Sequence, residues 1–182
     1  MIDKDALFYS ALELFSEKEM KFTMDELAKH LHISKRTLYE NIHSKEDLCL
    51  FAVERYFALV EEKQKPIRED VSLDPVEKVR RLLTATPTMP LSRLRMGASR
   101  LEYPKAYALL DEKLNTGWEK TFRIMDEGVA AGKLKPYDKK LFARVYASGI
   151  EGILTDCGVA GSAAFVEMQS RFVDLLLFGL AA

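Results

Sequence analysis

Apolar side chains recur every three or four residues over most of this chain, and this spacing predicts amphipathic helices. The first such stretch carries a single apolar stripe, made of Leu7, Phe8, Ala11, Leu12 and Phe15. No stretch rich in Val, Ile and Thr alternates between apolar and polar positions, as a half-buried strand would. The pattern therefore predicts an all-α fold.

Two short helices joined by a tight turn are predicted between residues 23 and 43. Thr23 and Glu26 have the spacing of a capping box, so the first helix should begin at Met24. The turn contains His32, where such turns commonly have glycine, and we expect a positive φ there. Ser34 then provides an N-cap for the second helix.

The remaining elements follow from caps, prolines and apolar spacing. In chain order, the predictions are a cap at Ser44 and Asp47, a long helix carrying Leu48 to Leu59, a connector over Glu61 to Asp74, a helix from Pro75 to about Ala85, an irregular stretch over Thr86 to Pro90, a helix over Leu91 to Tyr103, a helix from Pro104 to about Ala131, a loop over Gly132 to Tyr137, a cap at Asp138 and two final helices.

Two short helices in this arrangement form a helix-turn-helix, whose second helix enters the DNA major groove. The side chains predicted to project from that helix are Lys35, Arg36, Thr37, Tyr39 and Asn41. Lys35 and Arg36 have an alternative as solvated ends of a short helix. Asn41 fits a bidentate pair with adenine or, alternatively, a helix C-cap. The chain is therefore predicted to bind duplex DNA.

Twelve residues of this segment stand in a fixed spacing: Thr23, Leu27, Ala28, Ile33, Ser34, Thr37, Leu38, Tyr39, Ser44, Lys45, Glu46 and Leu48. In this respect the first 50 residues resemble the DNA-binding domain of TetR-type (TetR/AcrR-like) transcriptional regulators, whose pattern is close to T-x-x-x-I-A-x-x-x-G-V-S-x-x-T-L-Y-x-Y-F-x-S-K-E-x-L. The chain departs from that family at His32, Asn41, Ile42 and Glu19.

The resemblance implies roles for further residues. It places Thr37 and Tyr39 at DNA-contacting positions, with the Tyr39 hydroxyl on a phosphate; alternatively, Tyr39 is a half-buried aromatic that closes a small core. It also implies phosphate contacts at Lys45 and at Thr23. The function implied is a repressor that binds a palindromic operator as a homodimer and is released by a small-molecule inducer.

Charge supports DNA binding only locally. The whole chain is nearly neutral, with 27 basic and 28 acidic side chains. Between residues 29 and 45 there are four basic residues and one acidic residue, whereas residues 1 to 48 hold seven basic and ten acidic residues. Non-specific DNA affinity rises with the number of phosphates neutralised, so a single subunit should bind weakly and two subunits should double the contacts.

The last two helices carry the predicted dimer surface. Ala147, Ser148, Gly149 and Gly152 make one side of the first helix small, which allows another helix to approach closely. The apolar residues predicted to meet the second subunit are Ile150, Ile153, Phe165, Met168 and Phe172. In the resembling family these helices form a four-helix bundle with their mates. The alternative is that they pack only within one subunit.

The central region is rich in aromatic residues and methionine. By resemblance, a small-molecule effector should bind here, and the residues predicted to contact it are Met96, Tyr107, Trp118, Phe122 and Tyr146. Such residues at helical spacing are also typical of a plain hydrophobic core.

Other classes are less consistent with the sequence. All three histidines lie before residue 44, no carboxylate in the C-terminal half has an evident catalytic partner, and no zinc-ligand spacing occurs. We therefore expect no enzyme, no cofactor and no metal. The absence of a long apolar run predicts a cytoplasmic protein with no membrane partner.

The predicted domains are a DNA-binding head over 1–47 and a helical regulatory and dimerisation domain over 48–182. A rival function is a helical protein-protein interaction module that has lost sequence-specific DNA binding.

Overall fold

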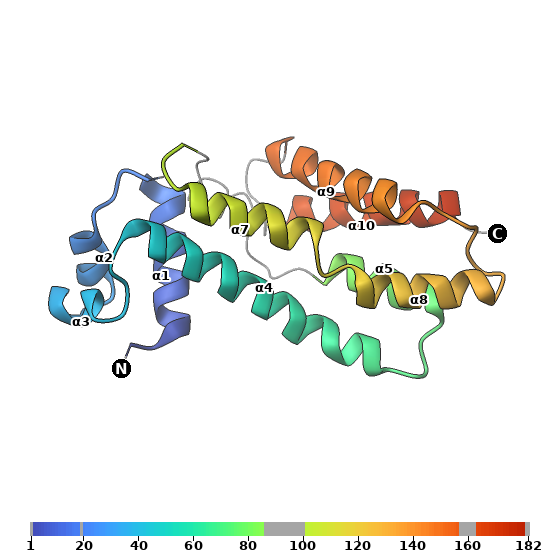
Figure 1. Ribbon diagram of the computed structural model, residues 1–182, viewed down its shortest axis with the longest axis horizontal. Coiled ribbons are helices and arrows are strands. Elements are labelled where there is room, and N and C mark those ends of the chain that lie inside the picture. Colours follow the sequence, from blue (N-terminus) through green and yellow to red (C-terminus); the bar gives the residue numbers. More distant parts are fainter. Residues whose placement is uncertain (1, 19, 86–100, 157–162, 181–182) are drawn as a thin grey trace. The chain divides into compact units, whose positions relative to one another are not determined.

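The computed structural model describes residues 2–18, 20–85, 101–156 and 163–180, and every regular element in these ranges is a helix (Figure 1). The predicted all-α fold is confirmed. The helices are α1 (Lys4–Lys18), α2 (Met24–His30), α3 (Lys35–Tyr39), α4 (Lys45–Glu69), α5 (Pro75–Thr84), α7 (Pro104–Asn115), α8 (Glu119–Ala130), α9 (Lys139–Asp156) and α10 (Ala163–Leu180).

Two compact units make up the chain. The first comprises residues 1–57 and 91–112, and the second comprises residues 58–90 and 113–182. Helix α4 therefore contributes its first half to one unit and its second half to the other.

The first unit buries the apolar stripe of α1 as predicted, because Leu7, Phe8, Ala11, Leu12 and Phe15 are all buried. Helix α2 packs against both α1 and α3 (Figure 1). Leu27, Leu38 and Leu48 complete this core from α2, α3 and α4. A small but fully apolar centre thus fixes the positions of the two short helices.

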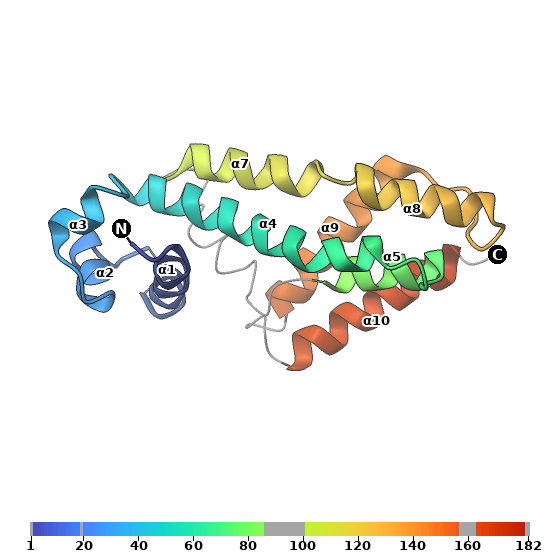
Figure 2. The same cartoon turned by 90° about the horizontal axis from the view of Figure 1, so that it is seen from below.

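The second unit is built around α5, which packs against both α8 and α10 (Figure 2). Its core consists of Val79, Leu82, Leu83, Ile124, Met125, Leu134, Phe142, Val173 and Leu177. Helix α5 begins as predicted: the Asp74 carboxylate accepts a hydrogen bond from the Val76 amide at 2.9 Å, and Pro75 occupies the first turn. At its other end, Tyr146 and the buried Gln169 both donate to the Leu83 carbonyl, at 2.6 and 3.1 Å.

Three predicted boundaries are wrong. Helix α4 continues to Glu69, through Pro66, although a connector was predicted from Glu61. The side chains in this stretch explain the extension: Glu61 pairs with Arg68 and, at 2.7 Å, with Lys120 of α8, while the Gln64 amide donates to the Leu82 carbonyl at 3.0 Å. Packing against α5 and α8 thus keeps this segment helical, although its composition predicts a loop.

The other two wrong boundaries are the continuity predicted for the helix from Pro104 to Ala131 and the end of the helix predicted over 91–103. The predicted helix from Pro104 to Ala131 is interrupted at residues 116–118, where Gly117 has a φ of +83°. Because this left-handed conformation ends a helix, α7 and α8 are separate. The predicted helix over 91–103 lies outside the described residues up to 100. Residues 101 and 102 form a turn, and Tyr103 is not helical, because a residue before proline is disfavoured in helical conformation.

Helices α9 and α10 approach closely at Gly149, where a Cβ atom would overlap the ring of Phe172. We expect Gly149→Ala to lower the free energy of unfolding by about 1–3 kcal/mol, because the ring must be displaced from a packed position. Urea denaturation of the purified protein measures this change.

The matched control for Gly149→Ala is Gly152→Ala, one turn further along the same helix. No atom lies within 4 Å of the added Cβ at Gly152. Alanine there should raise the stability of the single chain by about 0.5–1 kcal/mol, because it favours the helix without meeting a neighbour within the subunit. Equal effects of the two substitutions would contradict the role assigned to the contact between Gly149 and Phe172.

Candidate nucleic-acid interface

The first helix of the helix-turn-helix, α2, begins with the predicted capping box. The Glu26 amide donates to the Thr23 hydroxyl at 3.2 Å, and the Thr23 amide donates to the Glu26 carboxylate at 2.7 Å. Lys18 of α1 donates to the same carboxylate at 2.6 Å. These contacts tie the start of α2 to the end of α1.

The turn between the two helices explains the histidine at position 32. His32 has a φ of +53°, as expected for a position where glycine is common. Its amide donates to the Lys29 carbonyl, and the Ile33 amide donates to the Ala28 carbonyl, both at 3.0 Å. This pair of hydrogen bonds is a Schellman motif, which requires one residue in the left-handed region. The motif sets the angle at which α3 leaves α2.

Helix α3 presents the predicted DNA-contacting side chains. Ser34 caps it by accepting a hydrogen bond from the Thr37 amide at 3.0 Å, and Leu38 anchors it in the core. The Arg36 side chain is 89% exposed and that of Lys35 is 64% exposed, while Tyr39 is 42% exposed. The structure thus brings these three side chains together on one short helix, accessible to a partner.

Both basic residues of α3 are paired with carboxylates. Lys35 contacts Asp25 in the first turn of α2, and Arg36 donates from Nε to Glu40 at 2.9 Å, one turn along α3. Sequence spacing alone indicates the Arg36 pair, which joins positions four residues apart. The Lys35 pair crosses the turn and was not predicted.

Two polar residues of α3 make contacts within the head. The hydroxyl oxygens of Thr37 and Ser34 lie 2.8 Å apart. The Asn41 side-chain amide donates to the Thr37 carbonyl at 2.8 Å. This is the C-capping geometry that stood as the alternative to an adenine contact, and an adenine contact would require the amide to leave this carbonyl.

Lys45 is held inside the first unit. Its ammonium group donates to the Met20 carbonyl and lies 4.4 Å from the centre of the Phe22 ring. Burial lowers the pKa of the Lys45 ammonium group from its ordinary value. Lys45 therefore anchors the segment between α1 and α2, a structural role that the family pattern did not indicate.

The capping box makes the stability of the head dependent on pH. The hydrogen bond from Lys18, followed by that from the Thr23 amide, lowers the pKa of Glu26 from 4.5 to about 2. A carboxylate with a lowered pKa stabilises the fold above its unfolded pKa, and this contribution is lost as the pH falls towards the folded value. Wild type should therefore be more stable than Glu26→Gln at neutral pH, and the difference should shrink as the pH falls from 4.5 to about 2.

Urea denaturation at several pH values measures this difference. Glu17→Gln is the matched control, because Glu17 is an exposed carboxylate of α1 with no hydrogen bond or ion pair to the described residues. A gap between wild type and Glu26→Gln that stays constant across the pH range would refute the assignment.

Three of the predicted effector-contacting residues lie together in the second unit. Trp118 stacks on Phe122 with ring centres 5.5 Å apart, and its ring meets that of Tyr146 edge to face at 5.3 Å. Phe142 and Tyr137 extend this aromatic cluster. The rings pack against the core of the unit. Tyr107 belongs to the first unit, and Met96 lies outside the described residues.

The residues predicted at a dimer surface divide between the core and the exterior. Ile150 and Phe165 are buried within the chain, and Phe172 packs on Gly149, so packing within one subunit accounts for these three. Ile153 is half-buried. Met168 is exposed.

An exposed apolar stripe on α9 and α10 was not predicted as a set. On α9, Leu141 and Val145 are exposed, and on α10, Met168 and Leu175 are exposed. Gly152 and Gly179 continue the two rows at helical spacing and are also exposed. We call these six residues the outer stripe. It flanks the contact between Gly149 and Phe172 on both helices.

Within the described ranges, no group of three or more His, Cys, Asp or Glu side chains is arranged to hold a metal ion. None of the helices in those ranges is long and apolar enough to span a bilayer.

The fold and the site together define a helical protein of the helix-turn-helix class. Residues 5–50 match the family model described as "Bacterial regulatory proteins, tetR family". The chain is also 28% identical over 174 residues to an uncharacterized HTH-type transcriptional regulator of Bacillus subtilis (strain 168), YvaF, covering 93% of this chain and 90% of that protein.

Solved structures share the fold. The regulatory protein TetR from Rhodobacter sphaeroides has a TM-score of 0.73 at 20% identity, with 98% of each chain covered. A proposed transcriptional regulator from Saccharomonospora viridis, in complex with choline, has a TM-score of 0.76 at 17% identity, with 98% of this chain and 97% of that chain covered. These matches confirm the predicted resemblance to TetR-family transcriptional regulators.

Proposed function

We propose that this regulator is a repressor that binds a palindromic operator as a homodimer and is released by a small-molecule inducer. The observation that carries the proposal is the capped helix α3, which presents Lys35, Arg36 and Tyr39 to solvent. A helix of this kind reads base edges from the major groove. The DNA-binding head over residues 1–47 supplies this activity, and residues 48–182 supply regulation and dimerisation.

The outer stripe supports dimerisation through α9 and α10. Large apolar side chains arranged in two rows on adjacent helices favour burial against a second copy of the same surface. Two heads held by one dimer contact two half-sites, and this requirement gives the operator its palindromic form.

The aromatic cluster around Trp118 supports the inducer part of the proposal. One structural neighbour, from Saccharomonospora viridis, was solved with choline. In this chain the rings contact one another, so a ligand that enters between them must displace at least one. A ligand that binds one conformation of the dimer better than the DNA-bound conformation shifts the population and releases the operator. Because Trp118 is the single tryptophan of the chain, its fluorescence reports such a displacement directly.

Selection of bound sequences from a random duplex pool tests the proposal. We expect enrichment of a palindrome, followed by nanomolar, salt-sensitive binding of that duplex by the full-length protein. Compounds that change Trp118 fluorescence should then release the labelled duplex. A folded dimer that enriches no sequence would instead favour the interaction module.

A further inference from the structure

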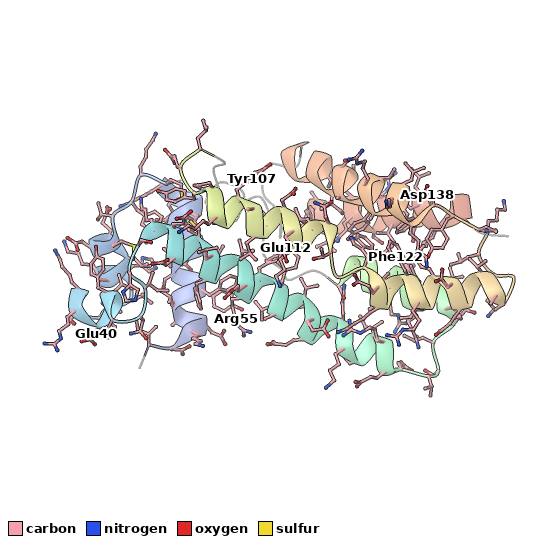
Figure 3. All side chains as sticks on the ribbon, viewed as in Figure 1. Glu40, Arg55, Tyr107, Glu112, Phe122 and Asp138 are labelled. Carbon is pink, nitrogen blue, oxygen red and sulfur yellow. The ribbon has the colours of Figure 1, made fainter. Side chains whose placement is uncertain are left out.

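The guanidinium group of Arg36 is held from one side by its own helix. Glu40 lies one turn further along α3 and accepts a hydrogen bond from Arg36 Nε at 2.9 Å (Figure 3 labels Glu40). The rest of the Arg36 guanidinium makes no hydrogen bond or ion pair with the described residues. A side chain that is 89% exposed is therefore restrained at a single donor.

The restraint determines which edge of the guanidinium group remains available. Arginine offers five N–H donors in a planar fork. With Nε occupied, the two terminal nitrogens form the free end of the fork. Two parallel N–H donors match the O6 and N7 acceptors of guanine in the major groove. The pair with Glu40 thus occupies the Nε donor of Arg36 and leaves its two terminal nitrogens available to bind guanine.

We infer that Glu40 is a positioning residue for base readout: it holds Arg36 so that the terminal nitrogens meet one guanine, and its negative charge lowers the affinity for all DNA. This inference rests on the proposed DNA-binding function. It assigns to an acidic residue of the recognition helix a gain in sequence discrimination and a loss in overall affinity, because a carboxylate near the DNA repels phosphates.

Asp25 provides an internal comparison. It pairs with Lys35 across the turn, and its carboxylate also lies beside the recognition helix. A lysine ammonium group is a point charge without a planar fork, so orienting it adds little base discrimination. Asp25 should therefore lower affinity for all sequences alike, whereas Glu40 should also affect the choice of base.

The experiment uses the full-length protein and the duplex enriched in the selection. Wild type, Glu40→Ala and Glu40→Gln are titrated, by fluorescence anisotropy, with that duplex, with single-base-pair variants of it and with a random duplex. Wild type should discriminate against replacement of one guanine in each half-site by about tenfold or more. Both substitutions remove the charge and should raise affinity for the random duplex by about two- to fivefold.

Discrimination separates the two Glu40 variants. Glu40→Ala removes the acceptor, so discrimination at that guanine should fall to about threefold or less, while Glu40→Gln keeps an acceptor oxygen and should retain an intermediate value. In an Arg36→Ala background, Glu40→Ala should have no further effect on discrimination. Asp25→Asn should raise affinity for all duplexes and leave discrimination unchanged.

The matched control is Glu54→Ala, which removes an exposed carboxylate from α4 that makes no hydrogen bond or ion pair with the described residues. Glu54→Ala should change neither the affinity for DNA nor the discrimination between bases. Equal discrimination by wild type and Glu40→Ala, with the fold intact by circular dichroism, would overturn the inference while leaving DNA binding established. Absence of any enriched sequence for wild type would instead overturn the proposed function itself.

Discussion

Simultaneous replacement of Lys35, Arg36 and Tyr39 by alanine is expected to weaken binding to the selected duplex by about 100-fold or more. Each side chain projects from α3 into solvent, and each subunit of a dimer would lose all three contacts. The core residue Leu38, on the same helix, is left in place. Anisotropy titration at fixed salt measures the loss.

The fold should survive this triple substitution. The two basic side chains are mainly exposed, and their ion pairs with Asp25 and Glu40 are surface pairs, which contribute little to stability. The urea midpoint should therefore change little. A charge-matched control is Lys113→Ala with Arg123→Ala, which removes two exposed basic residues outside the head and should retain operator affinity. A triple variant that binds as tightly as wild type would contradict the assignment of α3 as the reading helix.

Met168→Glu combined with Leu175→Glu is expected to convert the proposed dimer into a monomer. Both residues belong to the outer stripe, and Leu175 is 71% exposed in the single chain. Glutamate is tolerated there in water, but burying two carboxylates against a second subunit is strongly unfavourable. Light scattering after size exclusion should show half the molar mass of wild type.

Loss of the dimer should also weaken operator binding by about 100-fold or more, because the second head no longer binds as part of the same molecule. The control is Val166→Glu, which also places a carboxylate on an exposed position of the same helix. Val166 is 55% exposed but lies outside the outer stripe, so this variant should remain dimeric. Dimers of the double variant that retain wild-type mass would show that the subunits associate through another surface.

Much of the DNA-binding head was predictable from sequence because its determinants are local. The capping box joins Thr23 to Glu26, and the Ser34 cap joins residues three apart, so both can be recognised without knowing the fold. The positive φ at His32 follows from its position in the turn. Interactions of this range are fixed by spacing along the chain.

The extension of α4 required longer-range information. Pro66 and the charged residues near it read as a connector, yet contacts from Glu61 and Gln64 to α8 and α5 keep this segment helical. In the site, the partner of Lys35 comes from α2, and Lys45 is drawn to Met20 and Phe22. Such pairings depend on how the helices pack, and the spacing of residues along the sequence does not predict them.

The sequence by itself determined the helical class, the caps of the helix-turn-helix and the residues that α3 exposes to solvent, because each depends on neighbours within a turn or two. Only the tertiary structure decided which apolar residues of α9 and α10 face inward. Ile150, Phe165 and Phe172 were predicted at a dimer surface but pack within the chain, and the outer stripe remains exposed beside them. Apolar residues recur at the same helical spacing whether they pack within their own subunit or against another. Only the packing of α9 on α10 therefore distinguishes core residues from residues at an intersubunit surface.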